Sequence, residues 1–322
     1  MVRTPPLIPE TDSVSIEDLL AEAQAAARDS IPENTARAYK NDWKDFQRFC
    51  LSHQLAPLPA RPETVCAYLA SRAKIHKVST IRRRLTVIGK VHRIRGVENP
   101  LNDMRVRQTW LGIRRRCSVA EERKAPALLK DLQAICNGLD LTTLAGLRDK
   151  ALILLGFAGA MRRSELVALN CDQIQIADDG LVVLIRKSKT DQLGAGRKIG
   201  IPYGSNPLTC PVKSVFEWMT ASGISTDALF RKVNRHGRTE GDRLCAHSVA
   251  LIVKRAFAAI GKPPLPFSGH SLRAGLATQA AMSGASEKSI QDQTGHKSLK
   301  VLRTYIRDGN LFHDNAAKKT GL

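Results

Sequence analysis

The sequence predicts a mainly helical protein of two domains, with a small antiparallel sheet in the second domain. The chain has 322 residues, more than one hydrophobic core of about 100–200 residues requires. Apolar residues recur at three- to five-residue intervals in its helical segments, as expected for amphipathic helices. Two runs rich in β-branched residues differ from this pattern, LVVLIRKSKT and GRKIGIP, and they predict a β-hairpin.

The charge balance indicates a polyanionic partner. There are 50 Lys and Arg against 30 Asp and Glu, a net charge of +20, while 43% hydrophobic residues exclude a mainly disordered chain. Such an excess of positive charge is typical of proteins that bind nucleic acid or an anionic membrane surface. Because no apolar run approaches the roughly 18 residues of a membrane span, and the N-terminus lacks a signal-peptide pattern, we expect a soluble, cytoplasmic protein.

The cysteines and histidines do not predict a metal or cofactor site. The seven cysteines are widely spaced without any C-x-x-C pair, which argues against a disulfide framework or a zinc ribbon. His270, His296 and His313 lack the close pairing of metal ligands. Since no G-x-x-x-x-G-K-[ST] loop occurs either, we expect a protein that needs no metal, ATP or other cofactor.

The first domain is predicted over residues 15–120, after a flexible tail at 1–14 that contains three prolines. Ser15 can cap the first helix, and Pro57, Pro59 and Pro62 interrupt the apolar periodicity between later helices. The predicted helical segments are IEDLLAEAQAAARD, TARAYKNDWKDFQRFCLSH, PETVCAYLASRAKI, STIRRRLTVIGKVHRIRG and residues 101–116.

Positive charge is concentrated in the later helices of this domain. Between Arg72 and Lys124 there are sixteen Lys and Arg against four acids. A single basic triplet is often just a solvated helix face, but a bias over fifty residues favours helices that lie against phosphates. The candidate DNA contacts are Arg82, Arg83, Arg84, Lys90, Arg114, Arg115 and Arg116.

The second domain is predicted over residues 129–322, after a weakly patterned linker at 121–128. It begins with the helical segments LLKDLQAICNGL and TLAGLRDKALILLGFAGA. The hairpin follows, with the loop TDQLGAG between its strands and Asp179-Gly180 as a turn before them. From CPVKSVFEWM onward the pattern is helical again.

Two stretches of this domain place charged groups three residues apart. Arg162 and Glu165 open a helix, where the carboxylate can orient the guanidinium. His270 and Arg273 occupy the first turn of another helix, where backbone amides also favour an anion. Taken alone, each pair also fits an ordinary surface ion pair or a helix cap.

Two further stretches add groups suited to one phosphate. Gly295-His296 is followed by Tyr305 nine residues later, and Lys189 lies in the hairpin loop. A lone tyrosine on an apolar helix face is usually core, and a loop lysine is usually solvated. The order and spacing of all four stretches together nevertheless point to one catalytic site.

This set of motifs resembles the tyrosine recombinase (phage integrase) family over nearly the whole chain. The resemblance implies a helical core-binding (SAM-like) domain followed by a mixed α/β catalytic domain. One departure is that the family's usual Gly-Leu-Arg is Ala160-Met161-Arg162 here; alignment on Glu165 selects Arg162 and leaves Arg163 as a minor competitor.

The resemblance also implies a chemistry for these residues. A tyrosine phenolate can cleave a phosphodiester and keep its energy in a covalent intermediate. The implied roles are nucleophile for Tyr305, general base for His270, a transition-state clamp for Arg162 and Arg273, a donor to a nonbridging oxygen for His296, general acid for Lys189 and orientation for Glu165.

The function implied is a site-specific DNA recombinase that acts on double-stranded DNA through a 3′-phosphotyrosyl link and a Holliday junction. We expect a homotetramer in the synaptic complex, a monomer or dimer when free, and a bacterial, phage or plasmid origin with association to the nucleoid. The segment after Tyr305 forms either a terminal helix that docks on a neighbouring subunit or a frayed tail. A type IB topoisomerase or hairpin telomere resolvase would share the same residues, and a noncatalytic DNA-binding regulator is a more remote alternative.

Overall fold

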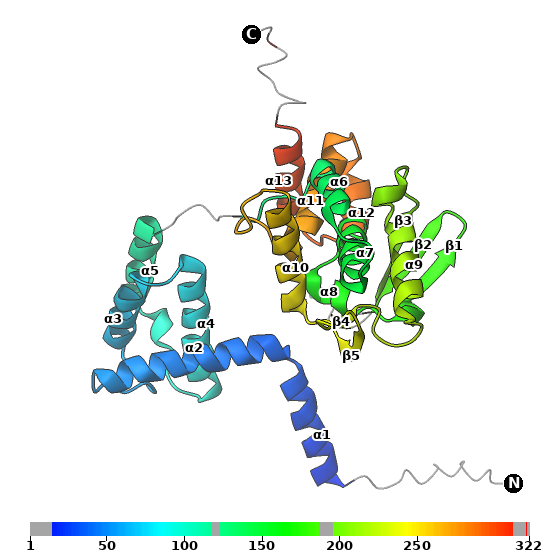
Figure 1. Cartoon of the computed structure of the whole chain (residues 1–322). Coiled ribbons are helices and arrows are strands. Elements are labelled where there is room, and N and C mark those ends of the chain that lie inside the picture. The colour runs from blue at the N-terminus through cyan, green and yellow to red at the C-terminus, as the bar shows by residue number, and fades with distance from the viewer. Residues whose placement is uncertain (1–14, 118–122, 187–195, 312–319, 321–322) are drawn as a thin grey trace, which may run out of the picture. The chain divides into compact units, whose positions relative to one another are not determined.

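A computed structural model describes residues 15–117, 123–186, 196–311 and 320. The chain divides into two compact units, Met1–Glu121 and Glu122–Leu322, each with its own core (Figure 1). The mainly helical class with small antiparallel sheets is confirmed. The expected tail at 1–14 and most of the segment after Leu311 lie outside the described residues.

The first unit is helical throughout its described residues. Its α-helices are α1 (Ile16–Asp29), α2 (Glu33–Ser52), α3 (Pro62–Ala73), α4 (Val78–Ile94) and α5 (Met104–Cys117), with a short 3₁₀ turn at Pro100–Asn102. Apolar faces of α2 to α5 form the core, in which Phe46 and Tyr68 pack edge to face with ring centroids 5.0 Å apart. The side chains described on α1 are exposed, so this helix adds little to the core.

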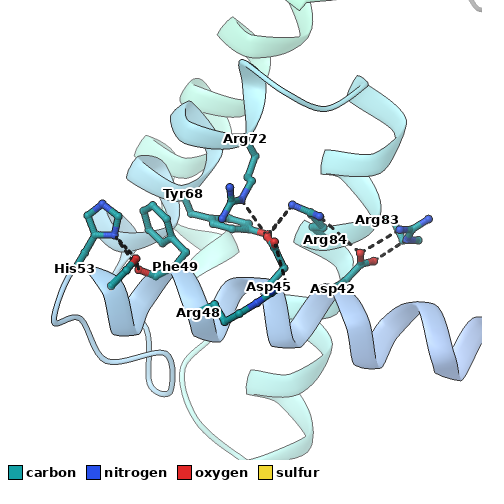
Figure 2. A network of polar contacts seen from close by, with 10 residues as sticks. Asp42, Asp45, Arg48, Phe49, His53, Tyr68, Arg72, Arg83 and Arg84 are labelled. Carbon is teal, nitrogen blue, oxygen red and sulfur yellow. Dashed lines mark hydrogen bonds and ion pairs between the residues drawn. The ribbon is translucent and has the colours of Figure 1, made fainter.

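A network of ion pairs lies beside this core, between α2, α3 and α4 (Figure 2). Asp42 accepts two hydrogen bonds from Arg83, at 2.6 and 3.0 Å, and lies 3.6 Å from Nε of Arg84. Asp45 accepts from Nη1 of Arg84 at 2.7 Å and from the Tyr68 hydroxyl at 2.8 Å. Nε of Arg72 also lies 3.0 Å from Asp45, so two aspartates give carboxylate contacts to all the arginines that the fold buries or half-buries here.

The second unit combines eight described α-helices with two small sheets. The helices are α6 (Leu129–Gly138), α7 (Leu144–Ala158), α8 (Arg163–Ala168), α9 (Pro211–Ser222), α10 (Ala246–Ala259), α11 (Gly269–Met282), α12 (Glu287–Thr294) and α13 (Leu299–Gly309). The strands are β1 (Ile174–Ala177), β2 (Gly180–Ile185), β3 (Arg197–Pro202), β4 (Arg231–Val233) and β5 (Thr239–Arg243).

The larger sheet confirms the predicted hairpin and extends it. Its order is β1-β2-β3, all antiparallel, and β2 pairs with β3 from Gly180 opposite Pro202 to Ile185 opposite Arg197. The added strand β1 pairs with β2 across the turn at Asp179. Ile199 and Ile201 are both buried on β3 and alternate with exposed neighbours, as expected for a strand with one face on the core.

The second sheet corrects the expectation of helix throughout the chain after residue 210. Arg231–Val233 and Thr239–Arg243 form a two-stranded antiparallel pair. The segment RKVNRHGRTEGDR has little apolar alternation, because its strands are short and largely solvent-exposed. The available signal was the turn Asn234–Gly237, where Gly237 adopts φ +73° and the Asn234 side chain accepts from two backbone amides.

The chain enters the second unit through close backbone contacts. Ala125 N donates to Pro266 O and Ala127 N donates to Ser271 O, both at 2.9 Å, so half of the predicted linker packs into this unit. A Cβ at Gly275 would lie 2.0 Å from the Ala127 carbonyl oxygen, which explains the glycine on α11. All seven cysteines are free thiols. Within the described residues, no helix is both long and apolar enough to cross a bilayer.

Candidate active site

Tyr305 and His270 lie in contact at the centre of the candidate site. Tyr305 is on α13 and His270 is in the first turn of α11, and Nε2 of the histidine lies 2.8 Å from the phenol oxygen. Ser268 caps α11 by accepting from the His270 amide at 3.3 Å. The tyrosine is nearly buried, at 7% exposure, and the fold thus joins two residues that are 35 apart in sequence.

Arg273 lies one turn further along α11 and is almost completely buried. Its Nη1 donates to the Ala160 carbonyl oxygen at 2.7 Å, and Ala160 adopts φ +46°, a left-handed conformation that is unusual for a residue with a side chain. Nη2 is buried and, among the residues that the structure describes, has no hydrogen-bond partner. An unpaired guanidinium N–H in this position is suited to an anionic ligand.

Arg162 and Glu165 form the predicted pair at the start of α8. Nη1 of Arg162 donates to Oε1 of Glu165 at 2.5 Å, and the Arg162 backbone amide donates to Oε2 at 3.0 Å. Glu165 is buried and Arg162 is partly exposed, so the carboxylate contacts the guanidinium from the protein interior and orients it. Arg163, the competing arginine, is exposed on the first turn of α8.

His296 is placed by the turn between α12 and α13. Gly295 ends α12 with φ +63°, and Nδ1 of His296 lies 2.7 Å from the Thr294 hydroxyl. The His296 ring centroid is 6.2 Å from that of Tyr305. The second motif histidine therefore lies beside the nucleophile candidate.

The electrostatics of the site favour neutral histidines and an added anion. Burial, then the charges of Arg273 and Arg162, lower the pKa of His270 below its ordinary value. The same causes lower the pKa of His296 to about 4. Burial and the neighbouring Arg162 lower the pKa of Arg273 to about 10. The pocket thus holds more positive charge than its own carboxylate balances.

A further arginine at this site was missed by the sequence analysis. Arg197, the first residue of β3, donates to the Gln293 carbonyl oxygen at 3.1 Å and lies 3.9 Å from Oε2 of Glu165. The sequence carried little signal for it, since a basic residue after a loop is usually solvated. Lys189, the predicted general acid, lies outside the described residues.

The predicted DNA contacts of the first unit fall into two groups. Arg84 is buried, since Ile81, Arg84, Leu85 and Ile88 form the inner face of α4, and its guanidinium is held by two aspartates. We therefore withdraw it as a DNA contact; the helical period of three to four residues was the signal against it. The others are exposed or half-buried: Arg82, Arg83, Lys90, Arg114, Arg115 and Arg116.

The chain is similar in sequence to known recombinases. The model of the phage integrase family matches residues 122–310. An integrase/recombinase XerD homolog of Selenomonas ruminantium is 39% identical over 306 residues, which cover 94% of this chain and 90% of that protein. The recombinase Cre of Escherichia phage P1 is 24% identical over 302 residues, covering 87% and 86% of the two chains.

A solved structure matches the fold as well. The crystal structure of a lambda integrase tetramer bound to a Holliday junction superimposes with a TM-score of 0.64 at 19% identity. The match covers 92% of this chain and 79% of that chain. It includes elements of both units, whereas the family model matches the second unit alone.

Proposed function

Because this chain belongs to the phage integrase family and is a site-specific tyrosine recombinase, we propose that Tyr305 links covalently to the 3′ phosphate of a cleaved DNA strand. One observation carries the proposal: the Tyr305 phenol lies 2.8 Å from His270 in a pocket with an excess of positive charge. A neutral imidazole in this position can accept the phenol proton.

The proposed step balances without ATP. The phenol oxygen attacks phosphorus and its proton passes to His270, while the bond from phosphorus to the 5′ oxygen breaks. The leaving 5′ oxygen takes a proton, which we assign to Lys189. A 5′ hydroxyl of the partner duplex then attacks the phosphotyrosine and returns a proton to Lys189, while Tyr305 leaves and regains its proton from His270. The number of phosphodiester bonds is therefore unchanged.

The arginines and the second histidine act on the transition state. As phosphorus becomes five-coordinate, negative charge grows on its nonbridging oxygens. Arg162 and Arg273 therefore stabilise the transition state more strongly than they stabilise the ground state. The unpaired Nη2 of Arg273 supports this role. His296 donates to a nonbridging oxygen, and Glu165 keeps Arg162 oriented.

The first unit positions the DNA in this proposal. Exposed basic residues on α4 and α5 supply phosphate contacts, which make binding strongly salt-dependent. In this proposal a homotetramer joins two duplexes, each of which carries one copy of the specific recombination site. The lambda integrase structure likewise contains a tetramer, bound to a Holliday junction. In this proposal the protein acts in the cytoplasm of a bacterial cell.

Covalent capture tests the proposal and identifies the target site in the same experiment. The protein is incubated with sheared genomic DNA of its source, denatured in detergent and collected with any attached strand. Sequencing of the attached 3′ ends should return one short site, and peptide mapping should place the nucleotide on Tyr305.

The matched control is Tyr305→Phe, which should still shift duplex DNA in a binding assay but yield no attached strand. Attachment by the Phe variant would overturn Tyr305 as nucleophile. Absence of any attached strand with the wild-type protein, despite binding, would overturn the proposed reaction.

A further inference from the structure

We propose that Arg197 is a positioning residue of this site, holding both Glu165 and the turn that carries His296 in their reactive arrangement. The inference rests on the proposed recombinase chemistry, because its effect is exerted on residues assigned there. Arg197 comes from β3, outside the motifs that defined the site.

The side chain of Arg197 connects three elements of the second unit. From β3 its Nη1 donates to the carbonyl oxygen of Gln293 on α12, at 3.1 Å. Its Nη2 lies 3.9 Å from Oε2 of Glu165 on α8. That nitrogen is buried and has no hydrogen-bond partner within the described part of the chain, so a small shift toward Glu165 would satisfy it.

The turn after α12 is shaped around this guanidinium. A Cβ at Gly295 would lie 3.0 Å from both Cζ and Nε of Arg197, so the glycine gives the arginine room as well as supplying the positive φ. The Gln293 side chain adds a second link, donating to the carbonyl oxygens of Ala158 at 2.7 Å and Gly200 at 3.1 Å. His296 therefore follows a turn that is tied directly to β3.

The charges explain why a third guanidinium is useful. Glu165 is 2% exposed and its near partner is Arg162. When Arg162 turns toward a phosphate, the buried carboxylate loses part of its compensation, which is unfavourable without another cation. Arg197 supplies that cation, so Glu165 can orient Arg162 without competing with the phosphate for it.

Single-turnover cleavage tests the inference. The probe is a nicked duplex carrying the site recovered by covalent capture, at saturating concentration. Arg197→Met should slow formation of the covalent adduct by about 10- to 100-fold, as a small misplacement of catalytic groups does. Arg197→Lys should recover part of this loss because it keeps the charge, and DNA affinity should stay within about twofold of wild type for both.

A double-mutant cycle separates positioning from a merely structural role. In a Glu165→Gln background the carboxylate charge is gone, so Arg197→Met should slow cleavage much less than it does in the wild type. Loss of packing alone would slow both backgrounds equally and would not distinguish Lys from Met. If Arg197→Met fails to fold, the Arg197→Lys cycle carries the same comparison.

Two control variants change a cation elsewhere in the unit. Lys198→Met alters the exposed neighbour of Arg197 on the same strand, and Lys150→Met alters a buried lysine paired with Glu217 at 2.8 Å. Both should cleave at the wild-type rate. Wild-type cleavage by Arg197→Met, or an undiminished effect of it in the Glu165→Gln background, overturns the inference; failure of the wild type to form an adduct overturns the proposed function instead.

Discussion

Clustered arginines are compensated differently in the two units. In the first unit, Asp42 and Asp45 lie within 3.8 Å of four arginines, Arg48, Arg72, Arg83 and Arg84, so each guanidinium has a carboxylate close by (Figure 2). In the second unit the described residues place three arginines around Glu165 alone: Arg162, Arg197 and Arg273.

The difference separates a structural use of charge from a reactive one. In the first unit each arginine of the network contacts a carboxylate in the folded chain, and these contacts tie α2, α3 and α4 together. In the second unit, burial and then the charge of Arg162 lower the pKa of Arg273, so its charge is unfavourable in the free protein and becomes favourable when a phosphate enters. Loss of an arginine from the site should therefore impair the reaction, and loss of a carboxylate from the network should impair stability.

The largest expected effect is that of Arg273→Met. Cleavage of the captured site should fall by about 10²- to 10³-fold, as for removal of one preorganised donor to a transition state. The free energy of unfolding should stay the same or rise, because a poorly compensated charge is removed. Single-turnover kinetics and chemical denaturation measure the two quantities. Unchanged cleavage with a large loss of stability would remove the distinction between the units.

Asp42→Asn is the complementary change in the first unit. It leaves Arg83 and Arg84 without one carboxylate and should lower the free energy of unfolding by about 3 kcal/mol. Below the melting temperature, cleavage at saturating DNA should remain near the wild-type rate. The control is Glu33→Gln, which removes an exposed ion pair with Arg37 on the same helix and should change stability by less than about 0.5 kcal/mol.

The pH dependence of stability should follow from the histidines of the site. Burial and nearby arginines lower the pKa of His296 to about 4, so the folded protein keeps this ring neutral while the unfolded chain protonates it near pH 6.5. The contribution of His296 to the free energy of unfolding is therefore complete above pH 6.5 and is lost between pH 6.5 and 4. The loss is on the order of 1 kcal/mol after allowance for solvent screening.

Thermal denaturation from pH 7 to pH 4 measures that loss. His296→Asn should flatten the curve, whereas His236→Asn, at an exposed position, should leave it unchanged. A rise in stability on acidification that depends on His296 would contradict the direction of the pKa shift.

The smallest expected effect compares two residues with positive φ. Gln54 in the first unit has φ +56° and is exposed, so Gln54→Gly should raise the free energy of unfolding by about 0.5–1 kcal/mol. Ala160 in the site has φ +46°, but its methyl group is buried. In Ala160→Gly the loss of about 0.8 kcal/mol of hydrophobic stabilisation from this methyl group should offset the gain from relieving the backbone strain. Equal gains at both positions would show that the Ala160 methyl contributes nothing.

Much of the fold was predictable because its signals are local. Apolar residues three to five apart identified the helices, and two runs rich in β-branched residues around a loop identified the hairpin of β2 and β3. The β4–β5 pair escaped prediction because its strands are short and polar, and its pairing rather than a buried face defines it. Arg84 was predicted as a DNA contact because of its charge. The helical spacing of Ile81, Arg84, Leu85 and Ile88 already indicated that it lies on the inner face of α4.

The sequence by itself determined the order and spacing of the motifs around Arg162, His270, His296 and Tyr305, because helical periodicity fixes which residues share a turn. Tertiary structure alone decided which groups meet across elements: the contact of Tyr305 with His270, the positive φ of Ala160 beneath Arg273, and Arg197 beside Glu165. Such contacts join residues up to 113 positions apart in sequence, and they depend on packing that no local pattern encodes.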